Sequence, residues 1–162
     1  MSEGIVSDIR ARTRRVLEAI ERTLAAVSDD TMRRPPGGWP VWRQFYHLLY
    51  WLDYWFVDPL AFRAPGFHQD SLLSPEAGPE PALSKQELRG YHIEISARVF
   101  DYLDRLTESE LCRLQTVRGG NRSRLDMMLG QFVHVYHHLG YICATVRTET
   151  GHSIWEAHPA SE

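Results

Sequence analysis

The sequence predicts an all-α protein, a four-helix bundle formed by a single domain over residues 1–162. Apolar residues recur at three- and four-residue steps in several long segments, which is the helical period. Segments rich in glycine and proline separate these runs, and no run alternates convincingly as a strand. A chain of 162 residues with 43% hydrophobic and 24% charged residues is large enough to bury one core and is typical of a globular protein.

The first two helices are predicted over residues 5–27 and 40–58. The segment RRPPGGW separates them and breaks the chain. Pro40 suits the first turn of a helix, where a missing N–H costs nothing, so the second helix is expected to begin there and to run to about Asp58. Apolar residues of the first helix recur close to the helical period at Ile5, Ile9, Val16, Leu17, Ile20, Leu24 and Val27.

A long crossover loop and a third helix follow. Residues 63–83 are rich in Pro, Gly, Ser and Glu, a composition too broken for a helix, and the segment is long for a simple connection. Ser84 and Glu87 form a capping-box pattern, which predicts the start of the third helix. The inward face of that helix is predicted to carry Leu88, His92, Ile95, Val99, Leu103 and Leu106.

The last part of the chain is predicted to hold a short turn and a fourth helix. Residues 107–110 offer a second capping box, which would open one short helical turn. The segment RGGN at residues 118–121 breaks the chain again. The fourth helix is expected to begin near Ser123 and to end near Gly151, a residue type suited to a helix C-terminus.

Composition and charge disfavour several classes of function. The net charge is −3 and the arginines are scattered, which argues against nucleic acid as the main partner. The N-terminus has no continuous apolar segment, so it does not resemble a secretory signal, and we expect a cytoplasmic protein. Charged residues interrupt the most hydrophobic segment, residues 41–62, which argues against a membrane span. Cys112 and Cys143 have no CxxC spacing and are expected to be reduced thiols.

Three histidines lie within five positions of an apolar stretch of the fourth helix. His134 and His138 are four residues apart, so they share one helix face and can converge on one ion. His137 lies about 60° to the other side of His134. An isolated HxxxH pattern is weak, and on spacing alone histidines that fill a core are the better explanation.

The second and third predicted helices favour a metal site over histidines that only fill a core. One face of the second helix gathers polar and aromatic residues, and the third helix carries His92 on its inward face. Three helices are thus each expected to direct an imidazole inward, and a metal ion would satisfy several of these buried groups together. The face of the second helix carries Arg43, His47, Tyr50, Trp51, Tyr54 and Asp58.

Two of these segments resemble the DinB/YfiT-like superfamily. GGWPVWRQFYHLLYWLDYW is similar to the second-helix signature of the family, and HVYHHLGYI to its fourth-helix signature. The stretch VFDYLDRLTESEL also resembles the family, so the resemblance covers nearly the whole chain. It implies a divalent metal bound by His47, His134 and His138, with His137 as a neighbour.

The chain departs from the family pattern at two places. Pro40 stands where the family often has a Ser or Thr N-cap, a difference that concerns the start of the helix and not the chemistry. After the last ligand the family often has Arg-Gly-Gln, whereas here residues 139–141 are Leu-Gly-Tyr. The three imidazoles are retained, while the residues that recognise a substrate differ.

Three neutral histidines with an open position are typical of a catalytic zinc site, and imidazole also suits nickel. The resemblance implies an enzyme that uses a low-molecular-weight thiol such as bacillithiol or mycothiol in an S-transferase reaction on a small-molecule substrate. A metal-dependent hydrolase and a non-catalytic metal-binding stress-response protein remain alternatives. The glutamate of an HExxH metalloprotease motif is absent. Candidates for a general base are His92, Tyr50 and Tyr54.

Geometry and apolar surface lead to two further expectations. Ligands at one level of the bundle require the second and third helices to run parallel, giving an up-down-down-up order that the long loop can accommodate. The fourth helix is also apolar away from its histidine face, and one bundle core would not bury both sides. A homodimer is the expected cover, although the first helix could also serve. The second face holds Met128, Leu129, Phe132, Tyr136, Leu139 and Cys143.

Overall fold

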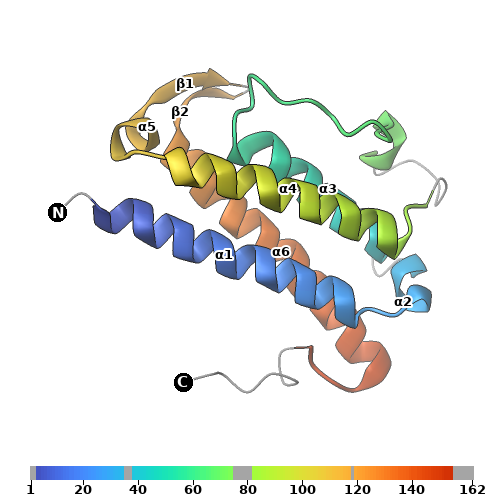
Figure 1. Cartoon of the computed structure of the whole chain (residues 1–162). Coiled ribbons are helices and arrows are strands. Elements are labelled where there is room, and N and C mark those ends of the chain that lie inside the picture. Colours follow the sequence, from blue (N-terminus) through green and yellow to red (C-terminus); the bar gives the residue numbers. More distant parts are fainter. Residues whose placement is uncertain (1–2, 35–37, 75–81, 118, 155–162) are drawn as a thin grey trace.

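The structure is a computed structural model, and it describes residues 3–34, 38–74, 82–117 and 119–154. The described residues are mostly helical, in agreement with the predicted all-α class. Four long helices dominate them (Figure 1): α1 (Glu3–Ala26), α3 (Val41–Phe56), α4 (Lys85–Arg105) and α6 (Arg124–Thr150). The smaller elements are α2 (Asp29–Arg33), the 3₁₀ turn η1 (Asp70–Leu72), α5 (Glu108–Cys112), β1 (Leu114–Val117) and β2 (Gly120–Ser123).

The helix ends follow the capping residues in the sequence. At the start of α4, Ser84 accepts from the backbone N–H of Glu87, while the Glu87 carboxylate accepts from the backbone of Ser84, which completes the predicted capping box. Ser123 caps α6 in the same manner by accepting from the Asp126 N–H. Gly151 ends α6 in the left-handed conformation with φ of 73°, which a residue without a Cβ adopts at little cost.

Residues 114–117 and 120–123 correct the prediction, which expected a break and no strand. They form an antiparallel pair of strands in which Leu114 pairs with Ser123 and Val117 with Gly120. Gly119 and Gly120 have φ of 96° and 115°, a backbone region that favours glycine in tight turns. Each strand has four residues. This is too short for an alternation of apolar and polar residues to be recognised in the sequence.

Contacts between helix ends fix how α1 lies against α4. Arg10, in the first half of α1, donates two hydrogen bonds of 2.6 and 2.8 Å to the carbonyl of Leu103 near the end of α4. Lys85, the first residue of α4, donates bonds of 2.8 Å to the carbonyls of Ala25 and Val27 at the other end of α1. The two helices therefore run in opposite directions (Figure 1).

The ends of α6 are attached to the segments that flank α3. At its start, the buried guanidinium of Arg124 donates to the carbonyl of Phe56 at 2.6 Å and to that of Val57. Near its end, Glu149 accepts from the hydroxyl of Thr31 at 2.5 Å. Thr31 belongs to α2, which precedes α3, and Phe56 is the last residue of α3. The start of α6 therefore lies at the end of α3, and the end of α6 lies near the segment before α3, so the two helices run antiparallel (Figure 1).

The long connection between α3 and α4 covers part of the helices. Its described portion is held to α3 by His68, whose Nδ1 atom lies 2.5 Å from the hydroxyl oxygen of Tyr46. The His68 ring also stacks on Tyr50 with centroids 4.8 Å apart. Residues 63–83 were predicted as a crossover loop, and residues 75–81 of it lie outside the described part of the chain.

The core forms one cluster to which all four long helices contribute. The apolar face of α3 is buried in it and consists of Phe45, Leu48, Leu49, Leu52 and Phe56. Burying one such side chain contributes about 1.5–3 kcal/mol to folding, so this face anchors α3. The opposite face of α3, which carries His47, is left for the functional site.

The second apolar face of α6 is covered partly from within the chain. Helix α1 packs against α6, and Met128, Phe132, Leu139 and Cys143 are buried. The expectation that one core would not bury both sides of α6 was therefore wrong for these residues, and the packing of α1 on α6 is the alternative cover that the sequence left open. Leu129 and Tyr136 stay exposed. Among the described helices, none combines the length and apolar character that a bilayer crossing requires.

Candidate metal centre

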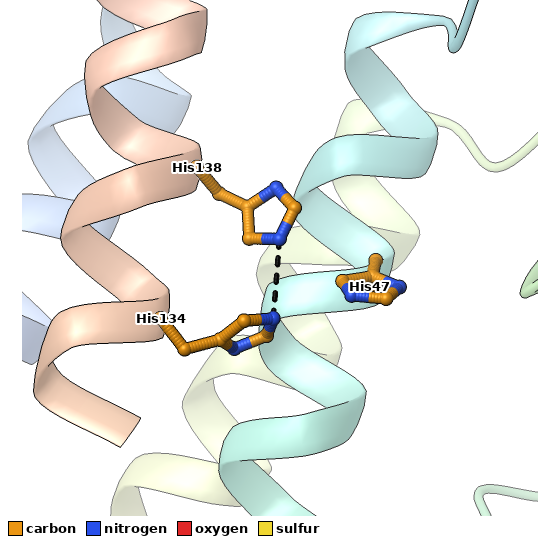
Figure 2. Close-up of side chains that lie close together, drawn as sticks. All are labelled: His47, His134 and His138. Atoms are coloured by element: carbon orange, nitrogen blue, oxygen red, sulfur yellow. Dashed lines mark hydrogen bonds between the residues drawn. The ribbon is translucent and has the colours of Figure 1, made fainter. Parts of the chain in front are cut away.

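Helices α3 and α6 bring three histidines together (Figure 2). His47 lies in the middle of α3, and His134 and His138 lie one turn apart on α6. One possible ligand atom from each lies within 4.8 Å of the other two. The Nε2 atoms of His134 and His138 are 3.1 Å apart, and the His47 ring centroid is 5.1 and 4.8 Å from theirs.

Burial keeps the three imidazoles neutral. Desolvation lowers the pKa of His47 to about 4 and that of His138 to about 3, and it also lowers the pKa of His134. Positive charge on one ring would repel charge on the others, which acts in the same direction. Neutral imidazole retains the lone pair that binds a metal.

The donor set fits a divalent metal ion. Two imidazole nitrogens bound to one tetrahedral zinc at 2.0–2.1 Å lie about 3.3 Å apart, close to the 3.1 Å between the Nε2 atoms of His134 and His138. The buried Nδ1 atom of His47 has no hydrogen-bond partner within the described residues, and the Nε2 atoms of His134 and His138 face each other. A buried polar atom without a partner is costly, so these rings are chemically suited to a cation.

A cavity of about 470 Å³ adjoins the cluster. His47 and His134 form part of its wall, so an ion at the cluster would face it. This is the arrangement that a catalytic site needs, because the protein supplies three ligands and leaves a position for a ligand from outside. The wall consists of His47, Trp51, Trp55, Arg122, Met127, Gly130, Gln131 and His134.

The predicted general bases lie elsewhere. Tyr50 and Tyr54 are half-buried on α3 but are not part of the cavity wall. Burial raises the pKa of Tyr50, which keeps its hydroxyl protonated. His137 is exposed, with its ring centroid 5.3 Å from that of His138, and so remains a neighbour of the cluster.

His92 corrects the prediction that three helices direct an imidazole into one seam. Its ring is buried against α1, with Nε2 3.1 Å from the carbonyl of Leu17 and Nδ1 3.4 Å from the carboxylate of Glu21. The inward face of α4 is shared between α3 and α1, and at this level it meets α1. The histidines that could hold a metal therefore come from two helices and not from three.

Several residues of the site were missed in the sequence. Gln44 lies one turn before His47 and contacts His138, and Gln131 lies one turn before His134 and lines the cavity. Their spacing from the histidines could have indicated them, because residues three apart share a helix face. Arg122 gave no such signal, since its position depends on the hairpin.

Comparisons with known proteins identify the fold and the family of the chain. A sequence model of the DinB superfamily matches residues 10–142. The crystal structure of a conserved protein of a locus from Enterococcus faecalis superposes with a TM-score of 0.63 at 18% identity, over 94% of this chain and 99% of that one, which shows a shared fold. No curated protein matches the sequence. The match over most of the length shows that this chain belongs to the DinB superfamily.

Proposed function

We propose that the protein binds a divalent metal ion, zinc or nickel, through His47, His134 and His138 on an up-down-down-up four-helix bundle. We further propose that it is a metal-dependent enzyme of the thiol S-transferase class, using a bacillithiol- or mycothiol-type thiol and a small-molecule substrate. The observation that carries the proposal is the meeting of three neutral imidazoles from two helices at the wall of a cavity.

The protein's own residues hold and orient the site. The Nδ1 atom of His138 lies 2.6 Å from Gln44 Oε1, so that nitrogen donates and Nε2 keeps its lone pair. Trp51 and Trp55 supply apolar surface to the cavity wall. When bound, a divalent ion supplies Lewis acidity, which favours the thiolate form of a thiol near neutral pH.

Thiol transfer is favoured over hydrolysis by the composition of the cavity wall. Metal-dependent hydrolases commonly add a positioned general base such as a carboxylate to the metal that acidifies the water. The described residues of the wall include neither Asp nor Glu. A thiolate needs no such base: its sulfur attacks an electrophilic carbon, the leaving group departs with the bonding electron pair, and the thiol proton passes to solvent. A hydrolase remains the second candidate because the resemblance supports it.

A thiol-conjugation assay tests the proposal. Untagged protein loaded with zinc or nickel is mixed with bacillithiol or mycothiol and 1-chloro-2,4-dinitrobenzene, with and without a chelator. We expect conjugate formation that requires both thiol and metal and that returns when metal is added back. Metal-dependent hydrolysis of ester or amide substrates without thiol would favour the hydrolase. Stoichiometric metal with neither activity would favour a non-catalytic stress-response role.

Self-association is also proposed. Leu129, Val133 and Tyr136 on the outer side of α6 remain 48%, 73% and 40% exposed. They follow one another at four- and three-residue steps, so they form a stripe on one face of the helix. A second copy of the chain would bury this stripe, which supports a homodimer.

A further inference from the structure

Among the described residues that line the cavity beside the histidines, one carries a permanent charge, Arg122. Metal binding by the histidines gives this residue no role. Arg122 lies on β2 and contributes to the cavity wall. Within the described ranges its guanidinium has no carboxylate partner, whereas Arg98 and Arg113 each pair with an acid at 2.7 Å. An arginine with free donors at a cavity suits a carboxylate, which accepts from the planar guanidinium in a bidentate manner.

The hairpin gives Arg122 a defined position. Arg122 pairs with Gln115 across the two strands, and the chain turns back through Gly119 and Gly120. Ser123 then caps α6, so β2 leads directly into the helix that carries His134 and His138. Arg122 thereby lies two residues before the start of α6 and lines the cavity, and its Nη2 atom would lie 3.7 Å from a Cβ at Gly119.

Two tryptophans supply the other recognition surface. Trp51 and Trp55 are one turn apart on α3, are half-buried and line the same cavity. Indole rings bury a large apolar area and pack well against flat or aromatic groups. The described wall holds no acidic residue, so no carboxylate there repels an anion that approaches Arg122.

We propose that the substrate of this cavity carries a carboxylate next to a flat apolar or aromatic group. Arg122 binds the carboxylate, and Trp51 and Trp55 pack against the flat group. A cavity of about 470 Å³ is of the size that accepts a small molecule. The inference rests on the proposed function in one respect, that the substrate reacts beside the histidines. Binding of the carboxylate by Arg122 does not depend on the proposed function.

The test compares phenylacetate with phenylacetamide, which differ in charge and little in shape. Each is titrated by calorimetry into the full-length, metal-loaded protein at fixed ionic strength. We expect phenylacetate to bind about tenfold more tightly than the amide, the effect of one charge-assisted interaction. Arg122→Gln should remove this preference by weakening the binding of phenylacetate much more than that of phenylacetamide. Trp51→Leu should weaken both ligands to a similar degree.

The control is Arg12→Gln, which removes an arginine from the separate groove between α1 and α6. It should leave both affinities unchanged. Equal affinities for the two ligands in the unaltered protein, no detectable binding of phenylacetate at millimolar concentration, or a preference that survives Arg122→Gln would overturn the inference. Loss of the preference in Arg12→Gln alone would place the ligand in the other groove and also overturn it.

Metal content measured on the same samples separates this inference from the proposed function. A preference that depends on Arg122 in a protein without stoichiometric metal would support the carboxylate site and contradict the metal centre. Stoichiometric metal without the preference would support the metal centre and contradict the carboxylate site. Because Arg122 is exposed on a hairpin, its replacement is expected to leave the fold and the metal content intact.

Discussion

The Nδ1 atom of His138 on α6 lies 2.6 Å from the Oε1 atom of Gln44 on α3. An amide oxygen only accepts, so this contact fixes the proton of His138 on Nδ1 and leaves Nε2 free toward His134. A group that holds a ligand ring in this way commonly changes metal affinity 10- to 100-fold when it is removed.

Replacing Gln44 with Leu should therefore weaken zinc binding about 10- to 100-fold, measured by competition with a chromogenic chelator. Gln44→Glu should retain or raise the affinity, because a carboxylate accepts the same proton more strongly. The matched control is Gln86→Leu on the exposed side of α4. Unchanged affinity in Gln44→Leu would show that the contact does not orient the ligand.

Each of His47→Ala, His134→Ala and His138→Ala should sharply reduce the stoichiometric metal of protein purified without a tag. Each variant leaves two imidazoles, too few to hold zinc as three do. His137→Ala and His152→Ala are controls that should keep the metal, since both side chains are exposed. Elemental analysis provides the readout, and a triple histidine variant with full metal content would contradict the site.

Arg124 is completely buried and donates to the last carbonyls of α3 and to the hydroxyl of Tyr102. Its positive charge also lies at the favourable end of the α3 dipole. We expect Arg124→Met to lower the free energy of unfolding by about 2–4 kcal/mol, measured by urea denaturation. Arg113→Gln breaks only an exposed ion pair with Glu110 and should change stability by less than about 1 kcal/mol. Similar losses of unfolding free energy in both variants would contradict the stabilising role of Arg124 at the end of α3.

Burial lowers the pKa of His92, against the opposing effect of Glu21, while Arg89 acts in the same direction as burial. The unfolded chain then binds more protons than the folded one once the pH falls below about 6.5. Stability is thus present above that pH and is lost on acidification. His92→Gln should flatten the fall in unfolding free energy between pH 7 and pH 5, by up to about 1.4 kcal/mol per pH unit. The exposed His152→Gln should leave the slope unchanged, and an equal slope in His92→Gln would refute the assignment.

The exposed stripe of Leu129, Val133 and Tyr136 predicts a dimer that Val133→Glu would dissociate, because a buried charge without a partner opposes association. Analytical ultracentrifugation at micromolar concentration provides the measurement. Ile93→Glu is the control, since Ile93 is a 59% exposed apolar residue on α4. An unaltered protein that sediments as a monomer would exclude the dimer.

Local signals made part of this structure predictable. The capping residues Ser84 and Ser123 located the starts of α4 and α6, because a hydroxyl that accepts from the first turn acts within three residues. The spacing of His134 and His138 likewise depends on the helix alone. The short helix α2 was missed because it lies beside a segment of Pro and Gly that dominates the local pattern.

Features that depend on distant segments could not be predicted in this way. Apolar periodicity gives the buried face of a helix but not the neighbour that covers it, so His92 was assigned to the wrong seam. The same limit applies to Phe132, whose ring centroid lies 6.0 Å from that of Phe56 on α3 and which also lines a groove with residues of α1. Arg122 reaches the cavity only because two four-residue strands pair, and strands this short carry little pattern.

The division of the three histidines between two helices links metal affinity to folding. His134 and His138 keep their spacing whenever α6 is helical, whereas His47 joins them only after α3 has packed onto α6. An ion that needs all three ligands binds the native state and hardly binds the unfolded chain, so it stabilises the native state by RT ln(1 + [M]/Kd). At free metal 100 times the dissociation constant this amounts to about 2.7 kcal/mol. The melting temperature should therefore follow the metal supply, and a chelator should loosen the docking of α3 before α6 loses its helix.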